Sequence, residues 1–312
     1  MVFEKKRING QYFTEYNPFK NDAFIEWATK CDIKNNVVLE PFAGSNNLII
    51  MLQKMGFIEK FVSYDIEPKN HNVKFRDTIY DFPQGFEICV TNPPYLARNS
   101  ATRRSLPFPD TFHDDLYKFS LGKCLESCKY VCAIIPASFL NAGLFRNRLS
   151  HYVLLNSKMF NDTEHPVCLS LFDSSSKDIK IYENEKYLGL MSEFEKKVPN
   201  VHNDLPIKFN EKNGNLGLLA IDNTTEPSIK FCEGRKINPE KVCVSSRSLT
   251  RILIDCDVEK TIKKLNDYLN SFREETHDLF LTPFKGLRKD NKYRRRLDFA
   301  LARKFINEVS AC

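Results

Sequence analysis

The chain has 312 residues, which is enough for one large domain or two domains of ordinary size. Hydrophobic residues make up 42% of it and charged residues 28%, a composition typical of a globular protein. No apolar run approaches the roughly 20 residues that a membrane-spanning helix needs, and the polar N-terminal segment lacks the apolar core of a secretory signal. We therefore expect a cytoplasmic protein that does not bind membranes.

The ten cysteines do not predict a disulfide framework, because the chain is long and shows no export signal. No Cys-x-x-Cys pair occurs, so neither a structural zinc site nor any other metal site is expected. Cys124, Cys128 and Cys132 have helical spacing, but Cys132 lies in an apolar run typical of a strand. We interpret the cysteines as small buried side chains.

The net charge of +6 is unevenly distributed. Between Lys285 and Lys304 nine Lys or Arg and two Asp give a local charge of +7, so the remaining residues sum to −1. A basic segment on a nearly neutral chain favours a polyanionic partner. A solvated helix face is the alternative.

From residue 20 to residue 175, short apolar runs alternate with longer segments of helical periodicity. This pattern predicts an α/β fold with a Rossmann-like, mostly parallel sheet, because strands buried on both faces are apolar throughout. Helices are predicted at residues 22–30, 47–55, 115–128 and 138–149. Strands are predicted at residues 37–39, 61–65, 87–91, 130–135, 152–160 and 167–172.

The pattern changes after residues 174–176, which are three serines. Short alternating stretches at residues 206–209 and 216–221, with turn signals such as Asn213-Gly214, predict hairpins. A helix at residues 258–272 and the basic tail follow. We therefore predict a first domain over residues 1–185 and a smaller mixed domain over residues 186–312.

The segment Glu40-Pro-Phe-Ala-Gly-Ser-Asn46 follows a predicted strand and opens a predicted helix. A turn of small residues at this junction lets a ligand approach the backbone and the helix N-terminus. Asp65 ends the next strand, where a carboxylate can accept hydrogen bonds from ribose hydroxyls. Many nucleotide-binding folds share this pairing, and a purely structural turn is the alternative.

A more specific motif, Asn92-Pro93-Pro94-Tyr95, directly follows the strand predicted at residues 87–91. Two consecutive prolines fix φ and remove two N–H donors, so a helix cannot absorb the neighbouring carbonyl groups. At the carboxyl edge of a parallel sheet these carbonyls face the ligand crevice. The motif thus predicts a rigid set of hydrogen-bond acceptors.

Such acceptors suit a planar amino group. The side-chain oxygen of Asn92 and the carbonyl of Pro93 can each accept one of its hydrogens, and Tyr95 offers a face for stacking. The bound nitrogen then becomes pyramidal and its lone pair is free for in-line attack. The electron-poor amino group of adenine needs this help, and no metal is required.

With these residues the chain resembles the gamma-class amino-methyltransferases that carry an Asn-Pro-Pro-Tyr motif, over residues 8–175. The resemblance implies a DNA adenine-N6 methyltransferase that uses S-adenosyl-L-methionine and has the fold of S-adenosylmethionine-dependent methyltransferases. It also implies that residues 1–185 are the catalytic domain and that residues 186–312 recognise double-stranded DNA. A restriction endonuclease acting separately would be a natural partner, and we expect a monomer, with a dimer as the alternative.

The resemblance further implies the roles of individual residues. Gly10-Gln-Tyr-Phe-Thr14 is similar to the element that lies against the methionine part of the cofactor, and Asp65 to the ribose partner. Asp77 resembles the carboxylate that binds the cofactor's adenine, with Asp81 as the alternative. The expected cofactor-binding residues are Tyr12, Phe13, Thr14, Glu40, Pro41, Ala43, Gly44, Asp65, Ile66, Asp77, Thr78 and Asn92.

The expected catalytic residues are Asn92, Pro93, Pro94, Tyr95 and Phe160. Phe160 resembles the aromatic residue that stacks on the target base, which must leave the duplex at a cost of about a few kcal/mol. The chain departs from the family at Gly44-Ser45-Asn46, where Gly-x-Gly is usual. Asn is the non-glycine residue that best tolerates positive φ, so we expect this loop to survive.

Two groups of arginines are expected to contact DNA phosphates. Arg103 and Arg104 fall in residues 97–110, which lack a helical pattern and predict a loop beside the catalytic motif. The others are Arg288, Arg294, Arg295 and Arg296 in the basic segment. Such contacts supply affinity and salt dependence rather than base readout.

Three alternatives remain open. The same motif also serves methyltransferases that act on a protein glutamine, because an amide nitrogen is planar as well. A basic surface would suit RNA as well as DNA. A non-catalytic DNA-binding protein with a methyltransferase-like core would explain the substituted glycine at Asn46.

Overall fold

The computed structural model describes residue 14 and residues 16–156, 159–160, 165–200, 205–243 and 246–310. The chain forms two compact units, which divide between Leu188 and Gly189. Within the described part of the chain, no helix is both long enough and apolar enough to cross a membrane.

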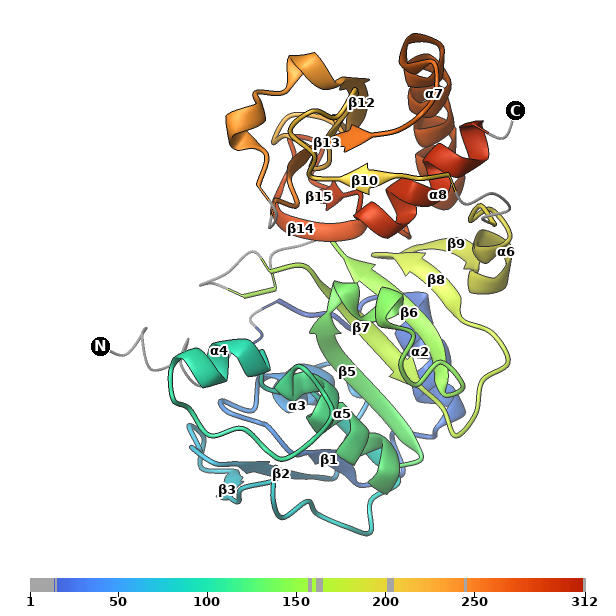
Figure 1. Cartoon of the computed structure of the whole chain (residues 1–312). Coiled ribbons are helices and arrows are strands. Elements are labelled where there is room, and N and C mark those ends of the chain that lie inside the picture. Colours follow the sequence, from blue (N-terminus) through green and yellow to red (C-terminus); the bar gives the residue numbers. More distant parts are fainter. Residues whose placement is uncertain are drawn as a thin grey trace. The chain divides into compact units, whose positions relative to one another are not determined.

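A nine-stranded sheet dominates the chain up to residue 190, in the order β3-β2-β1-β4-β5-β7-β6-β8-β9 (Figure 1). The strands β1 to β5 run parallel to one another, and β7 runs antiparallel to both β5 and β6. This confirms the prediction of a mostly parallel α/β sheet. The strands are β1 (Val38–Glu40), β2 (Phe61–Asp65), β3 (Val73–Phe75), β4 (Ile88–Thr91), β5 (Tyr130–Pro136), β6 (Leu149–Leu155), β7 (Val167–Phe172), β8 (Lys180–Glu183) and β9 (Lys186–Leu190).

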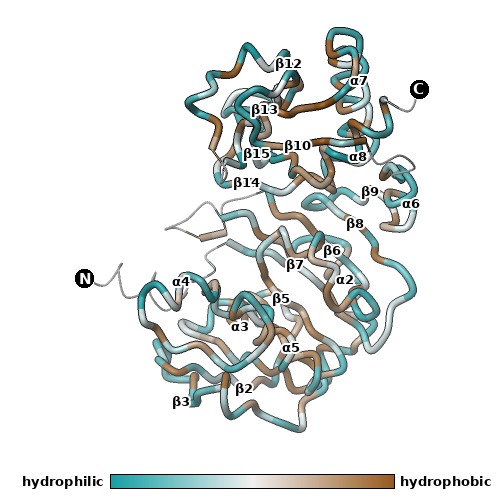
Figure 2. The backbone as a smooth tube through the Cα atoms, in the orientation of Figure 1, coloured by the Kyte–Doolittle hydropathy of each residue, from teal (hydrophilic) through white to brown (hydrophobic). Residues whose placement is uncertain are grey.

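The central strands are apolar because both faces of the sheet are covered. Every residue of β4, β6 and β7 is buried, which explains why these strands are mostly hydrophobic. Figure 2 shows the same hydrophobic character along β5. The helices of this unit are α2 (Asp22–Lys30), α3 (Asn47–Lys54), α4 (Arg98–Arg103) and α5 (Leu116–Ser127), with a 3-10 helix η1 (Ala137–Ala142).

The helices lie on opposite faces of this sheet. Trp27 of α2 and Ile49 of α3 pack in one hydrophobic cluster with Ile88 and Val90 of β4. Cys89 alternates with these two residues and therefore faces the other way, where it interacts with Cys124 of α5. Consequently the carboxyl ends of β1, β2 and β4 are left open to receive a ligand.

The second unit is smaller and mixes strands with helices, as predicted. A four-stranded sheet in the order β10-β13-β11-β12 has antiparallel pairs, and β14 pairs with β15 in a separate hairpin. Leu265 and Phe305, from two helices, share a core with Leu218 of the sheet. The elements are α6 (Met191–Glu195), β10 (Lys208–Phe209), β11 (Leu216–Leu219), β12 (Lys230–Glu233), η2 (Gly234–Lys236), η3 (Pro239–Lys241), β13 (Leu249–Leu253), α7 (Val258–Thr276), β14 (Thr282–Leu287), β15 (Tyr293–Arg296) and α8 (Phe299–Ser310).

Three expectations about secondary structure were wrong. The helix predicted at residues 138–149 is only the short η1, because Gly143 and Phe145 have positive φ and the chain enters β6 at Leu149. The loop predicted at residues 97–110 contains α4. The strand predicted at residues 152–160 runs from Leu149 to Leu155 and leaves Phe160 outside it.

Candidate active site

A cavity of about 280 Å³ opens at the carboxyl ends of the parallel strands. Glu40 is the last residue of β1, Asp65 the last residue of β2, and Asn92 directly follows β4. The parallel register of these three strands therefore brings residues from distant parts of the sequence together. The lining residues are Thr14, Glu40, Phe42, Ala43, Gly44, Ser45, Asn47, Leu48, Asp65, Ile66, Asp77, Thr78, Ile79, Tyr80, Asn92, Pro94, Leu96, Leu106, Pro107, Pro109 and Leu116.

The loop between β1 and α3 keeps its turn despite the missing second glycine. Asn46 adopts φ of 64°, and Gly44 adopts φ of 49°. The side-chain oxygen of Asn46 accepts a hydrogen bond of 2.8 Å from the Ser63 hydroxyl. The expectation that Asn would tolerate this backbone conformation is therefore confirmed.

The carboxylate of Asp65 is oriented by two backbone amides. Gly44 donates to its Oδ2 at 2.8 Å and Glu67 donates to its Oδ1 at 2.7 Å. Each carboxylate oxygen can accept a second hydrogen bond, so both remain competent to bind a ligand hydroxyl. The loop and the carboxylate thus form one preorganised wall of the cavity.

Glu40 is the most strongly perturbed acid in the cavity. Its side chain is 1% exposed, and burial raises its pKa to about 8. Among the described residues, its Oε2 atom has no hydrogen-bond partner. Glu40 lines the cavity, and a buried carboxylate there is suited to a cationic group of a ligand, because pairing would offset its desolvation.

Asn92 is held by two hydroxyl groups. Its Nδ2 donates to Oγ1 of Thr14 at 3.3 Å, and its Oδ1 accepts from the Tyr95 hydroxyl at 2.8 Å. The Tyr95 hydroxyl also lies 2.7 Å from the carbonyl oxygen of Ile134. The Asn-Pro-Pro-Tyr motif is therefore anchored both to β5 and to Thr14, which precedes α2.

The structure distinguishes the two candidate adenine partners. Asp77 lines the cavity, whereas Asp81 is exposed and forms a two-pronged ion pair with Arg76. Thr78 next to Asp77 is buried and donates to the carbonyl of Pro41 at 2.7 Å. The position of Asp77 is thus fixed through its neighbour Thr78, which is bound to the loop that lines the cavity.

The aromatic residues are placed differently from the expectation. Tyr95 and Phe160 are not among the described residues that line the cavity, and Phe160 is fully buried. Their ring centroids lie 6.3 Å apart at an interplanar angle of 76°. Phe160 therefore presents no face to a stacking base in this conformation, which corrects its expected role. Tyr12 and Phe13 lie outside the described residues.

Several lining residues were missed by sequence reasoning. Phe42 and Ser45 sit inside the recognised loop, so the loop motif alone would have found them. Leu106, Pro107 and Pro109 follow α4 and close over the motif from a segment without periodicity. Only the tertiary structure places that segment at the cavity.

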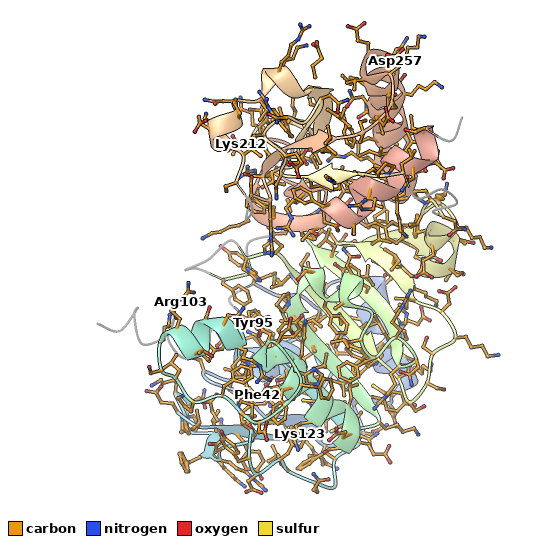
Figure 3. The ribbon with its side chains drawn as sticks, viewed as in Figure 1. Phe42, Tyr95, Arg103, Lys123, Lys212 and Asp257 are labelled. Atoms are coloured by element: carbon orange, nitrogen blue, oxygen red, sulfur yellow. The ribbon has the colours of Figure 1, made fainter. Side chains whose placement is uncertain are left out.

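Arg103 and Arg104 are exposed, and Figure 3 labels Arg103 on α4 together with Tyr95 and with Phe42. Both follow the Asn-Pro-Pro-Tyr motif by fewer than ten residues; Arg103 is the last residue of the short helix α4, and Arg104 is its C-cap. Both side chains are therefore accessible to a partner.

In the second unit, two arginines of the basic segment are buried, and one of them binds a carboxylate of the same unit. Arg288 and Arg295 are 5% and 4% exposed. Arg288 binds the fully buried Asp222 at 3.0 Å, and Arg273 binds both oxygens of the same carboxylate at 2.9 Å. The expectation that Arg288 and Arg295 contact phosphates is corrected, because buried guanidinium groups are unavailable to DNA.

This ion cluster stabilises the charged form of Asp222. Burial alone would raise the pKa of Asp222, but hydrogen bonding and attraction from Arg273 hold it below its usual value. Arg294 and Arg296 are half-buried, and the Arg294 guanidinium lies 5.2 Å from the centre of the Phe284 ring. On hairpin β14–β15, Arg294 and Arg296 therefore remain the candidates for contact with DNA phosphates.

The sequence places the chain in a protein family. Residues 9–164, half of the chain, match the model of the Eco57I restriction-modification methylases. The chain therefore belongs to the Eco57I restriction-modification methylase family. No curated protein sequence matches it.

Solved structures with a similar fold show low sequence identity. A protein from Listeria monocytogenes described as a class I S-adenosylmethionine-dependent methyltransferase has 10% identity and a TM-score of 0.38, covering 51% of this chain and 63% of its own. The type I restriction-modification methyltransferase subunit from Streptococcus thermophilus has 14% identity and a TM-score of 0.37, covering 59% and 52%. This chain thus spans less than two thirds of either protein.

Proposed function

We propose that this protein transfers a methyl group from S-adenosyl-L-methionine to the N6 amino group of adenine in double-stranded DNA. The observation that carries the proposal is that Asn92 of the Asn-Pro-Pro-Tyr motif lines the same cavity as Asp65 and Asp77. One cavity is thus lined by a side chain that can accept from an amine, Asn92, and by two carboxylates that can bind a nucleoside, Asp65 and Asp77.

The cavity residues fit the cofactor in three places. Asp65 would accept the ribose hydroxyls, and Asp77 would accept the adenine amino group. Glu40 supplies the unpaired buried oxygen that suits the α-ammonium group. When bound, S-adenosylmethionine supplies an electrophilic methyl carbon.

The protein's own residues contribute by positioning the target amine. Asn92 Oδ1 and the Pro93 carbonyl accept the two hydrogens of the target amine, which turns the nitrogen lone pair toward the methyl carbon. The methyl group would pass from the cofactor's sulfur to this nitrogen, and the nitrogen would lose a proton to solvent. The adenine must leave the duplex for this attack, at a cost of about a few kcal/mol.

An Asn92→Ala variant tests the proposal. We expect it to lose methyl transfer to duplex DNA while calorimetry still detects cofactor binding, because Asn92 acts on the target amine. Asn99→Ala, the same change on an exposed residue of α4, is the control and should keep both properties. Cofactor binding without any transfer by the wild-type protein would refute the proposed activity.

The substrate is tested separately. Mapping methylated positions after incubation with random-sequence DNA, RNA or denatured protein distinguishes N6-methyladenine in DNA from RNA or glutamine methylation. We further propose that Arg103 and Arg104 contact phosphate, so replacing both by Ala should lower the slope of log affinity against log salt by about 2. Lys34 and Lys60 precede β1 and β2 at the opposite sheet edge, and their double Ala variant should leave the slope unchanged.

A further inference from the structure

The carboxamide of Asn92 is held at both ends by hydroxyl groups. Thr14 accepts from Nδ2 at 3.3 Å, and Tyr95 donates to Oδ1 at 2.8 Å. A carboxamide turned by 180° would present its NH₂ group where the oxygen now lies, and an NH₂ group cannot accept from an amine. The orientation of this one side chain therefore decides whether the site can bind an amino group.

The Tyr95 hydroxyl faces two acceptors with a single hydrogen. Its oxygen lies 2.8 Å from Asn92 Oδ1 and 2.7 Å from the Ile134 carbonyl oxygen. Neither of those oxygens can donate, so the hydroxyl hydrogen is shared between them. When an incoming amine donates to Asn92, the hydroxyl can turn wholly to Ile134 without losing a hydrogen bond.

Thr14 is a rigid partner at the other end. Its side chain is buried, and its carbonyl oxygen accepts from Nδ2 of Asn47 at 2.8 Å. Asn47 is the first residue of α3, directly after the loop that lines the cavity. Thr14 thus contacts both Asn47, next to that loop, and Asn92, which lies 78 positions later in the sequence.

We propose that Thr14 and the Tyr95 hydroxyl are positioning residues that hold the Asn92 carboxamide with Oδ1 toward the target amine, and that Tyr95 releases Oδ1 by donating to Ile134. The inference rests on the proposed function, since it assigns the residues that orient the acceptor. It gives Tyr95 a role through its hydroxyl that is independent of stacking by its ring.

Three variants separate these roles. Thr14→Val keeps the shape but removes the acceptor, Thr14→Ser keeps the hydroxyl, and Tyr95→Phe keeps the ring. Loss of one neutral hydrogen bond is worth about 1 kcal/mol, so Thr14→Val and Tyr95→Phe should each slow single-turnover methylation about fivefold at saturating cofactor and DNA. Thr14→Ser should recover most of the loss, and the KM for DNA should stay near the wild-type value in all three variants.

The double variant Thr14→Val/Tyr95→Phe provides a sharper test. Because both hydroxyls orient the same carboxamide, the combined loss should differ from the product of the single losses. A merely structural role would instead lower stability, which the fluorescence of the single tryptophan, Trp27, reports.

The outcomes are distinguishable. If the wild-type protein methylates adenine in DNA and both single variants react within twofold of its rate, the inference is overturned while the proposed function stands. Equal rates for Thr14→Val and Thr14→Ser would also overturn it. A wild-type protein that transfers no methyl group would overturn the proposed function, and the inference with it.

Discussion

Replacing Glu40 by Gln should change how stability depends on pH. The pKa of Glu40 is raised by burial from 4.5 to about 8, so the folded protein favours the protonated form. The contribution of protonated Glu40 to the free energy of unfolding is complete below pH 4.5, and it is lost as the pH rises toward 8. For these two values, raising the pH from 5 to 7 lowers the unfolding free energy of the wild-type protein by about 2 to 3 kcal/mol. A glutamine does not titrate, so this loss disappears in the variant.

The assay is urea unfolding followed by the fluorescence of Trp27. This is the only tryptophan in the chain, it is fully buried, and its indole donates to the Phe172 carbonyl within the first unit. Its signal therefore reports the unit that contains Glu40. Glu59→Gln makes the same change on an exposed side chain and should leave the pH dependence unaltered.

The reasoning is refuted if the difference between wild type and Glu40→Gln varies by less than about 0.5 kcal/mol between pH 5 and pH 7, the size of an ordinary surface effect. The same carboxyl should also respond to the cofactor. Pairing with a cation favours the ionised form, so binding at pH 7 should release up to about one proton. Calorimetry in buffers of different ionisation enthalpy measures that release, which should vanish in the variant.

Three other substitutions probe the framework. Asp222→Asn should destabilise the second unit by about 3 kcal/mol, because it removes the fully buried negative charge that Arg273 and Arg288 share; unchanged hydrogen exchange in hairpin β14–β15 would contradict this. Asn46→Ala should be less stable than Asn46→Gly by about 1 kcal/mol, since glycine adopts the positive φ of this position without strain and alanine does not; Trp27 fluorescence measures both, and the opposite order would disprove the explanation. Thr78→Val should weaken cofactor binding about fivefold by removing the hydroxyl that donates to Pro41, and calorimetry that shows equal affinity would exclude this role.

Local sequence patterns were sufficient to predict many of the strands and helices of the first unit. Strands such as β4 and β7 were predicted because both faces are buried and their residues are apolar throughout, and α5 was predicted from its periodicity. The motif at Asn92 and the loop from Glu40 could be placed at strand ends, because the carboxyl ends of parallel strands share one edge. The positive φ of Asn46 was expected because Asn stands where the resembled family has a glycine, and Asn tolerates that conformation.

Tertiary structure decided what local patterns do not encode. Charge counts grouped Arg288 and Arg295 with the other arginines of the basic segment, but Asp222, more than sixty residues earlier, draws Arg288 into a buried ion cluster. The burial of Phe160 and the hydroxyls on either side of Asn92 likewise depend on contacts between distant segments. Sequence periodicity reports which side of an element faces the core, whereas only packing determines which distant group meets a given side chain.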